Sequence, residues 1–171
     1  MAVIEKFLGQ RVEIPEDRLY YAKQGLWAKS EGNEMVFGLT EPALVLAGGV
    51  NDLDWLVSEN ASVKSGQDVV FVITGKIMYI DTPLNGKIYF NPELKQNIAL
   101  FTHDPYGEGW LFRIQSDDDL KAGVQSALEA KGYADSLKNS EGLKNPKGLK
   151  GGVSGICKAV YSGIRDQKIS K

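Results

Sequence analysis

The 171-residue sequence contains one cysteine, one histidine and no long apolar segment. Because Cys157 is alone, a disulfide framework, a CxxC redox pair and a cysteine zinc site are excluded. His103 is not part of a cluster of metal-ligating residues, so neither a metal site nor a histidine general base is expected. No apolar run approaches the about 20 residues of a membrane-spanning helix, and Glu5 and Lys6 interrupt the N-terminus too early for a signal peptide. We therefore expect a cytoplasmic protein without a membrane segment.

Charge is unevenly distributed along the chain. The formal net charge is −2, but residues 138–171 hold eight basic and two acidic side chains, a net charge of +6, which leaves −8 for residues 1–137. Such a basic tail indicates either a solubilising, partly disordered extension or a segment that docks on the acidic body or on an acidic partner. Tyr161 is the only aromatic residue in the tail and the glycines lack phosphate-loop spacing, so no nucleic-acid or nucleotide binding is expected.

Short apolar segments separated by Gly and Pro turns dominate the first two thirds of the sequence. This pattern predicts strands at 19–22, 26–29, 35–39, 54–57 and 110–114. Thr40, followed by Glu41 and Pro42, predicts the start of a short helix that ends at Gly48. Many short strands with two or three peripheral helices predict a mainly β domain of the sandwich or barrel type.

The C-terminal part of the sequence predicts helices. Ser116 precedes three aspartates and the apolar residues Leu120, Val124 and Leu128, which predicts a capped helix ending near Gly132. The Gly-rich and Lys-rich stretch 141–152 is typical of a linker. Residues 154–168 can form a short helix with one apolar face, made of Ile156, Val160, Tyr161 and Ile164. We therefore divide the chain into a β domain, residues 1–137, and a basic linker with a short helical tail, residues 138–171.

The segment from Val70 to Lys87 is the most informative one. It predicts two apolar strands folded back on each other, with Lys76 at or beside the turn. A tight turn that holds a lysine in solvent is how carrier domains present a residue for covalent attachment of a cofactor. The pattern therefore indicates a carrier rather than an enzyme, whereas a solvated lysine is the ordinary alternative.

Several motifs resemble those of one known family. The run Asp-Pro-Tyr-Gly-Glu-Gly-Trp-Leu at 104–111 is similar to a signature of the H protein of the glycine cleavage system. Other similar segments follow in the family's order: 26–32, 37–41, 63–66, 82–86 and 91–94. The resemblance covers roughly residues 14–135, and the basic tail lies beyond it.

The resemblance implies a barrel-sandwich hybrid of two antiparallel sheets with peripheral short helices, here with a C-terminal helical extension. It implies a lipoyl carrier that shuttles an aminomethyl group, with lipoate joined through an amide to Lys76. Glycine decarboxylase, aminomethyltransferase, dihydrolipoamide dehydrogenase and a lipoate ligase are the implied partners. The lipoyl dithiolane is a two-electron redox couple, and a long flexible arm raises its effective concentration at successive partner sites.

Three departures from the family pattern keep alternatives open. The loop between Lys76 and Pro83 is one residue shorter, Ile73 stands where the family has glutamate, and Gly25 replaces the histidine before Leu26-Trp27. One alternative is an H-like lipoate-binding paralogue that carries sulfur in a heterodisulfide-reductase-like oxidation system. The other is a scaffold without lipoate that acts only as a binding module.

Overall fold

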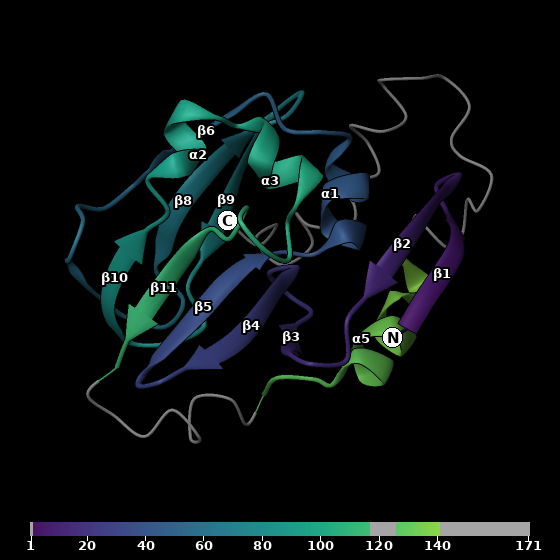
Figure 1. Ribbon diagram of the computed structural model, residues 1–171, viewed down its shortest axis with the longest axis horizontal. Helices are drawn as coiled ribbons and strands as arrows, with labels where there is room; N and C mark the ends of the chain where they lie inside the picture. The colour runs from purple at the N-terminus through teal and green to yellow at the C-terminus, as the bar shows by residue number, and fades with distance from the viewer. Residues whose placement is uncertain (1, 117–125, 141–171) are drawn as a thin grey trace.

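The computed structural model describes residues 2–116 and 126–140, which fold mainly into antiparallel strands (Figure 1). The strands are β1 (Ala2–Phe7), β2 (Gln10–Ile14), β3 (Leu19–Tyr21), β4 (Leu26–Glu31), β5 (Glu34–Leu39), β6 (Asp52–Trp55), β7 (Ser62–Val63), β8 (Asp68–Ile73), β9 (Ile77–Asp81), β10 (Gly86–Phe90) and β11 (Phe112–Gln115). The helical elements are α1 (Glu41–Ala47), α2 (Glu93–Gln96), α3 (Ala99–His103), α5 (Ala130–Ser136) and the 3-10 helix η1 (Leu137–Asn139). The predicted mainly β fold with short helices is confirmed, whereas the helix predicted at 154–168 lies outside the described residues.

Two sheets enclose the main core. One has the strand order β3-β4-β5-β11-β10-β7 and the other the order β6-β8-β9. Fully buried side chains of both sheets belong to one cluster, among them Phe37, Val72, Ile88 and Ile114. Because side chains alternate between the two faces of a strand, each sheet can bury one apolar face in this way. The predicted packing of antiparallel sheets is thus confirmed, and the described strands form open sheets rather than a closed barrel.

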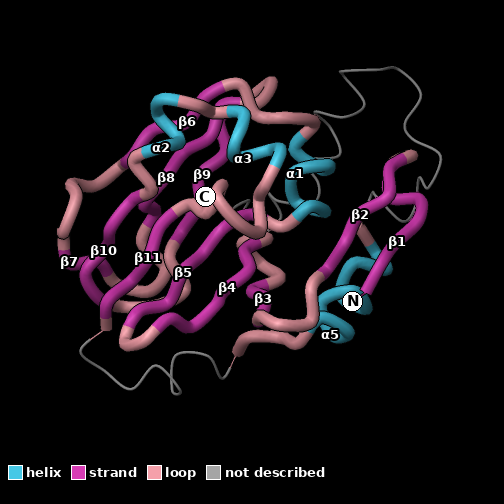
Figure 2. The backbone as a smooth tube through the Cα atoms, in the orientation of Figure 1, coloured by secondary structure: helices cyan, strands magenta, loops and turns pink. Residues whose placement is uncertain are grey.

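A third sheet, formed by β1 and β2, is not among the strands predicted from the sequence. Phe7, Val12 and Ile14 of this hairpin share a second buried cluster with Trp27 of β4 and Tyr133 of α5. The ring of Tyr133 also stacks on Tyr20, with 4.9 Å between the ring centroids. The hairpin and α5 therefore form a separate layer beside the six-stranded sheet (Figure 2).

Helix α1 begins and ends where its sequence predicts. The hydroxyl of Thr40 accepts a hydrogen bond from the backbone N–H of Ala43 at 3.1 Å, and Gly48 ends the helix in the left-handed conformation. Thr40 is completely buried, and its hydroxyl also lies 2.7 Å from the Tyr133 hydroxyl. This pair connects the start of α1 to α5.

Other local predictions are corrected by the structure. Pro92–Asn97, expected to be a loop, contains α2, and Gly132 lies inside α5 instead of ending a helix. Leu128 forms an antiparallel bridge with Tyr20, so the helix predicted from Leu120 does not extend that far. The start of that predicted helix, residues 117–125, lies outside the described part of the chain. The boundary at residues 137 and 138 stays a prediction.

Candidate functional site

Lys76 lies in the turn of the β8–β9 hairpin and is exposed. Ile73 and Ile77 are paired across the hairpin, so three residues, Thr74, Gly75 and Lys76, make the connection. The backbone N–H of Thr74 donates to the carbonyl oxygen of Lys76 at 2.9 Å, which closes the turn. The structure therefore places the predicted site residue at the tip of a tight hairpin in the middle of the chain.

The turn is held from both sides. The Thr74 hydroxyl, in a side chain that is 8% exposed, donates to the Lys76 carbonyl at 3.3 Å and accepts from the Lys76 N–H at 3.4 Å. The side-chain amide of Asn51 donates a hydrogen bond to the carbonyl oxygen of Thr74 at 2.7 Å. The backbone N–H of Asn51 donates to the carbonyl oxygen of Ile73 at 2.8 Å. These bonds fix the backbone that presents Lys76. Asn51 was not predicted as part of the site, because an asparagine before a strand carries no sequence signal of such a role.

Apolar side chains surround the turn on the outer face of the three-stranded sheet. Ile77 and Tyr79 are 52% and 39% exposed, and their cross-strand partners Ile73 and Phe71 are partly buried. Ile73 therefore continues an apolar surface at the position where the family pattern has a glutamate. Exposed apolar surface of this kind often marks a place where another molecule binds.

Acidic residues border this apolar surface on β6. Asp52 and Asp54 are both exposed and lie opposite Ile73 and Phe71 in the sheet. Asp54 forms an ion pair with Lys95 at 2.5 Å, and the hydrogen bond from Lys95 lowers the pKa of its carboxyl group. The surface beside Lys76 thus combines an apolar centre with an acidic edge.

The signature at 104–111 has a structural role. The Tyr106 hydroxyl donates to the carbonyl oxygen of Glu13 in β2 at 2.5 Å and accepts from the backbone N–H of Glu41 at 3.0 Å. The guanidinium of Arg18 lies over the rings of both Trp27 and Tyr106, 4.7 and 5.3 Å from their centroids. The signature at 104–111 therefore connects β2, α1 and β4 rather than forming part of the hairpin that bears Lys76.

Gly25, which replaces the family's histidine, occupies a position that only glycine suits. Its φ is +69°, and a Cβ there would lie 2.8 Å from the Cβ of Ala43. Its carbonyl oxygen accepts a hydrogen bond from the N–H of Thr40, the N-cap residue of α1. This departure therefore has a packing explanation.

His103 ends α3 and is exposed. Among the described residues, no group of three or more His, Cys, Asp or Glu side chains could hold a metal ion. No helix within residues 2–116 and 126–140 is long and apolar enough to cross a membrane.

Comparison with known proteins assigns the chain to a family. The family model described as Glycine cleavage H-protein matches residues 19–140. A Glycine cleavage system H protein from Pseudoalteromonas atlantica is 35% identical over 127 residues, which cover 72% of this chain and 95% of that protein. A Probable glycine cleavage system H protein 2 from Sulfurisphaera tokodaii is 33% identical over 139 residues, covering 77% of this chain and 93% of that protein.

The fold comparison agrees. The crystal structure of a glycine cleavage system H protein from Mycobacterium marinum matches with a TM-score of 0.58 and 27% sequence identity, covering 72% of this chain and 98% of that one. The matched region contains both sheets of the main core and the β8–β9 hairpin, whereas the whole β1–β2 hairpin precedes the family match. The chain belongs to the glycine cleavage H-protein family.

Proposed function

We propose that this protein is a lipoyl carrier of the glycine cleavage system, with lipoate attached to Lys76. The observation that carries the proposal is an exposed lysine in a three-residue turn, on a fold that belongs to the H-protein family. The ε-amino group of a lysine can form an amide with the activated carboxyl group of lipoate. The turn's hydrogen bonds to Thr74 and Asn51 hold the backbone in place, so that motion is confined to the side chain and its attached arm.

The residues around the turn suit this group. When it is attached, lipoate supplies a dithiolane, a two-electron thiol–disulfide couple that can hold an aminomethyl group. The chain itself supplies position: a rigid hairpin, an exposed attachment point and an adjacent surface of Ile77 and Tyr79 for contact with other proteins. Ile73 in place of glutamate changes the chemistry of that surface from acidic to apolar, but it leaves Lys76 exposed.

The partners follow from this role. Glycine decarboxylase, aminomethyltransferase and dihydrolipoamide dehydrogenase carry out the reactions, a lipoate ligase attaches the cofactor, and the carrier is their shared substrate rather than an enzyme. The names of the relatives favour glycine cleavage over the sulfur-carrying alternative. We propose that the protein works in the cytoplasm, beside those enzymes.

A reconstituted reaction tests the proposal. We expect glycine-dependent NADH formation by the three partner enzymes to require the lipoylated chain and to rise in proportion to its concentration below saturation. The unmodified chain, which keeps the same surface, is the matched control and is expected to give no NADH. A lipoylated chain that gives no more NADH than the unmodified chain would contradict the proposed pathway.

A further inference from the structure

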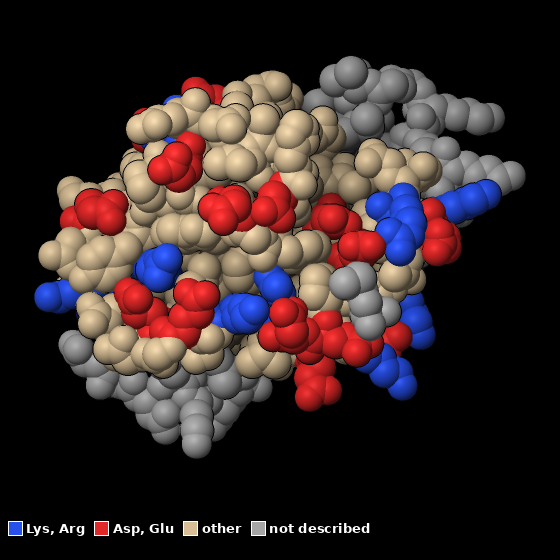
Figure 3. Space-filling model, viewed as in Figure 1, with Lys and Arg blue, Asp and Glu red and all other residues tan. Residues whose placement is uncertain are grey.

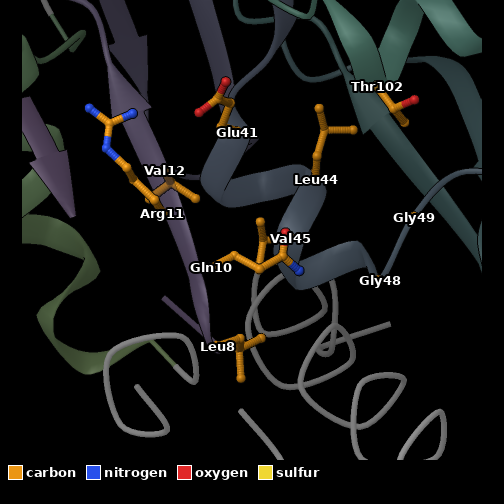
Figure 4. Close-up of a pocket in the computed structure, with 10 residues that line it drawn as sticks. All are labelled: Leu8, Gln10, Arg11, Val12, Glu41, Leu44, Val45, Gly48, Gly49 and Thr102. Atoms are coloured by element: carbon orange, nitrogen blue, oxygen red, sulfur yellow. The ribbon is translucent and has the colours of Figure 1, made fainter. Parts of the chain in front are cut away.

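A groove of about 580 Å³ lies between the β1–β2 hairpin and α1 (Figure 4). We call it the hairpin groove; its lining includes Leu8, Arg11 and Val12 from the hairpin and Glu41, Leu44 and Val45 from α1. One of its walls comes from residues that precede the family match at 19–140 and the other from residues within it, so the matched region alone does not form the groove.

The charged side chains of the groove are already paired within the protein. Arg11 forms ion pairs with Glu13 at 2.7 Å and with Glu5 at 3.9 Å, and Figure 4 shows its guanidinium turned away from α1. A carboxylate oxygen of Glu41 accepts a hydrogen bond from the backbone N–H of Glu13 at 2.7 Å. The groove presents apolar as well as polar surface, and its apolar part includes Leu8 from the hairpin and Val45 from α1, both partly exposed.

Leu8 occupies a position that a leucine rarely takes. It lies in the turn between β1 and β2 with a φ of +50°, beside Gly9 at +80°. Asparagine, aspartate or glycine is usual at such a position, because a positive φ brings the side chain of other residues too close to the backbone. The Leu8 side chain packs partly against the second buried cluster and also lines the groove, so it adds apolar surface there.

The chain itself contains a segment that matches this groove. Ile156, Val160, Tyr161 and Ile164 form the apolar face predicted from the sequence, which we call the tail stripe. Its basic surroundings complement the body of the protein, since residues 138–171 have a net charge of +6 and residues 1–137 one of −8. Figure 3 shows acidic side chains along the boundary between the six-stranded sheet and the N-terminal hairpin.

The end of the described chain allows the tail to reach the groove. Leu137 of η1 packs in the same cluster as Phe7 and Val12 of the hairpin, so the chain leaves the described body next to the groove's outer wall. The fifteen residues 141–155 can span up to about 50 Å when extended. That length exceeds the diameter of about 36 Å of a compact domain of about 130 residues.

We propose that the tail stripe binds in the hairpin groove of the same chain, against Leu8 and Val45. The two parts of the sequence that lie outside the family match would then contact each other and cover the apolar side of the hairpin. This proposal does not depend on lipoylation of Lys76.

The single cysteine provides a direct test. Successive residues of a helix are about 100° apart, which places Cys157 within the tail stripe. In the native full-length protein we expect its thiol to react with an aromatic disulfide reagent at least about tenfold more slowly than in the same protein in urea. We expect the rate constant to be independent of protein concentration and to rise with salt, because salt screens the attraction between tail and body.

Substitutions distinguish the hairpin groove from other binding places. Leu8→Asn removes the apolar side chain and relieves the positive φ, so the hairpin stays folded, and we expect the Cys157 thiol to react several-fold faster. Leu56→Asn is the matched control, because Leu56 is 41% exposed and does not line the groove, and we expect no change. A thiol that reacts as fast in the native protein as in urea would overturn the proposal. So would protection that Leu8→Asn leaves unchanged, or protection that increases with protein concentration, which would indicate a second copy as the ligand.

Discussion

Lys76→Arg is expected to abolish glycine-dependent NADH formation in the reconstituted system. Arginine keeps the positive charge and the length of the side chain, so the turn between Ile73 and Ile77 should be preserved. Its guanidinium is protonated at all accessible pH values and does not form the amide with lipoate that a lysine amine forms. The measurement is the rate of NADH formation after incubation of each variant with a lipoate ligase, ATP and lipoate.

Two neighbouring lysines provide the controls for this prediction. Lys64 and Lys87 are the nearest lysines before and after Lys76 in the sequence, and both are exposed. Lys64→Arg and Lys87→Arg are expected to retain the rate of the unsubstituted protein. A Lys76→Arg protein that keeps this rate, with an unchanged circular dichroism spectrum, would show that another residue carries the group.

Gly109→Ala is expected to lower the free energy of unfolding by about 3 kcal/mol, a fall in Tm of about 6 to 12 °C. A Cβ at this position would lie 2.2 Å from the carbonyl oxygen of Leu100 and 2.8 Å from that of Asp104. Both atoms belong to the backbone, so the clash cannot be relieved by a change of side-chain rotamer. The loop that holds Tyr106 and Trp110 would have to move, and thermal unfolding followed by circular dichroism measures the cost.

Gly132→Ala is the matched control, and its effect is expected to have the opposite sign. Gly132 lies inside α5, and a Cβ there would lie 3.5 Å from the Cβ of Leu128, an ordinary van der Waals contact. Alanine in the middle of a helix is more stable than glycine by about 0.5 to 1 kcal/mol, so Tm should rise slightly. Equal effects of the two substitutions would show that close contact around Gly109 is not what requires a glycine.

The sequence predicts the hairpin and the sheets well, because their signals are local. Two short apolar runs, 69–73 and 77–80, flank the turn at 74–76, which predicts two strands, and Val70 and Val72 are fully buried. The cap of α1 is equally local, since Thr40, Glu41 and Pro42 are adjacent in the chain. The exposed position of Lys76 follows from the same pattern, whereas its lipoylation remains a proposal.

Features that depend on distant contacts are not predictable in this way. The β1–β2 hairpin has a register irregularity between Ile4 and Phe7 and an unfavourable turn residue, Leu8, so its sequence lacks a clear hairpin signal. A glycine such as Gly132 is typical of a helix end. Here the helix continues past it, because the next residue, Tyr133, stacks on Tyr20 and stabilises α5 at this point. Helices α2 and α3, four and five residues long, are too short to show a periodic pattern.

In the candidate site, too, local features could be predicted from the sequence and features that depend on distant contacts could not. Lys76 could be found from its place between two apolar strands, because the turn is a local feature. Asn51 could not, since it reaches the turn through a tertiary contact 23 residues away from Thr74 in the sequence. The apolar surface of Ile77 and Tyr79 was also missed, because exposure on the outer face of a sheet depends on what other elements leave uncovered.

The position of the modification tests most directly whether Lys76 is the attachment residue. The full-length protein is incubated with a lipoate ligase, ATP and lipoate, digested, and its peptides are analysed by tandem mass spectrometry. We expect one lipoyl amide per chain, on Lys76. A chain that remains unmodified, or one that carries the lipoyl group on a different lysine, would contradict this expectation.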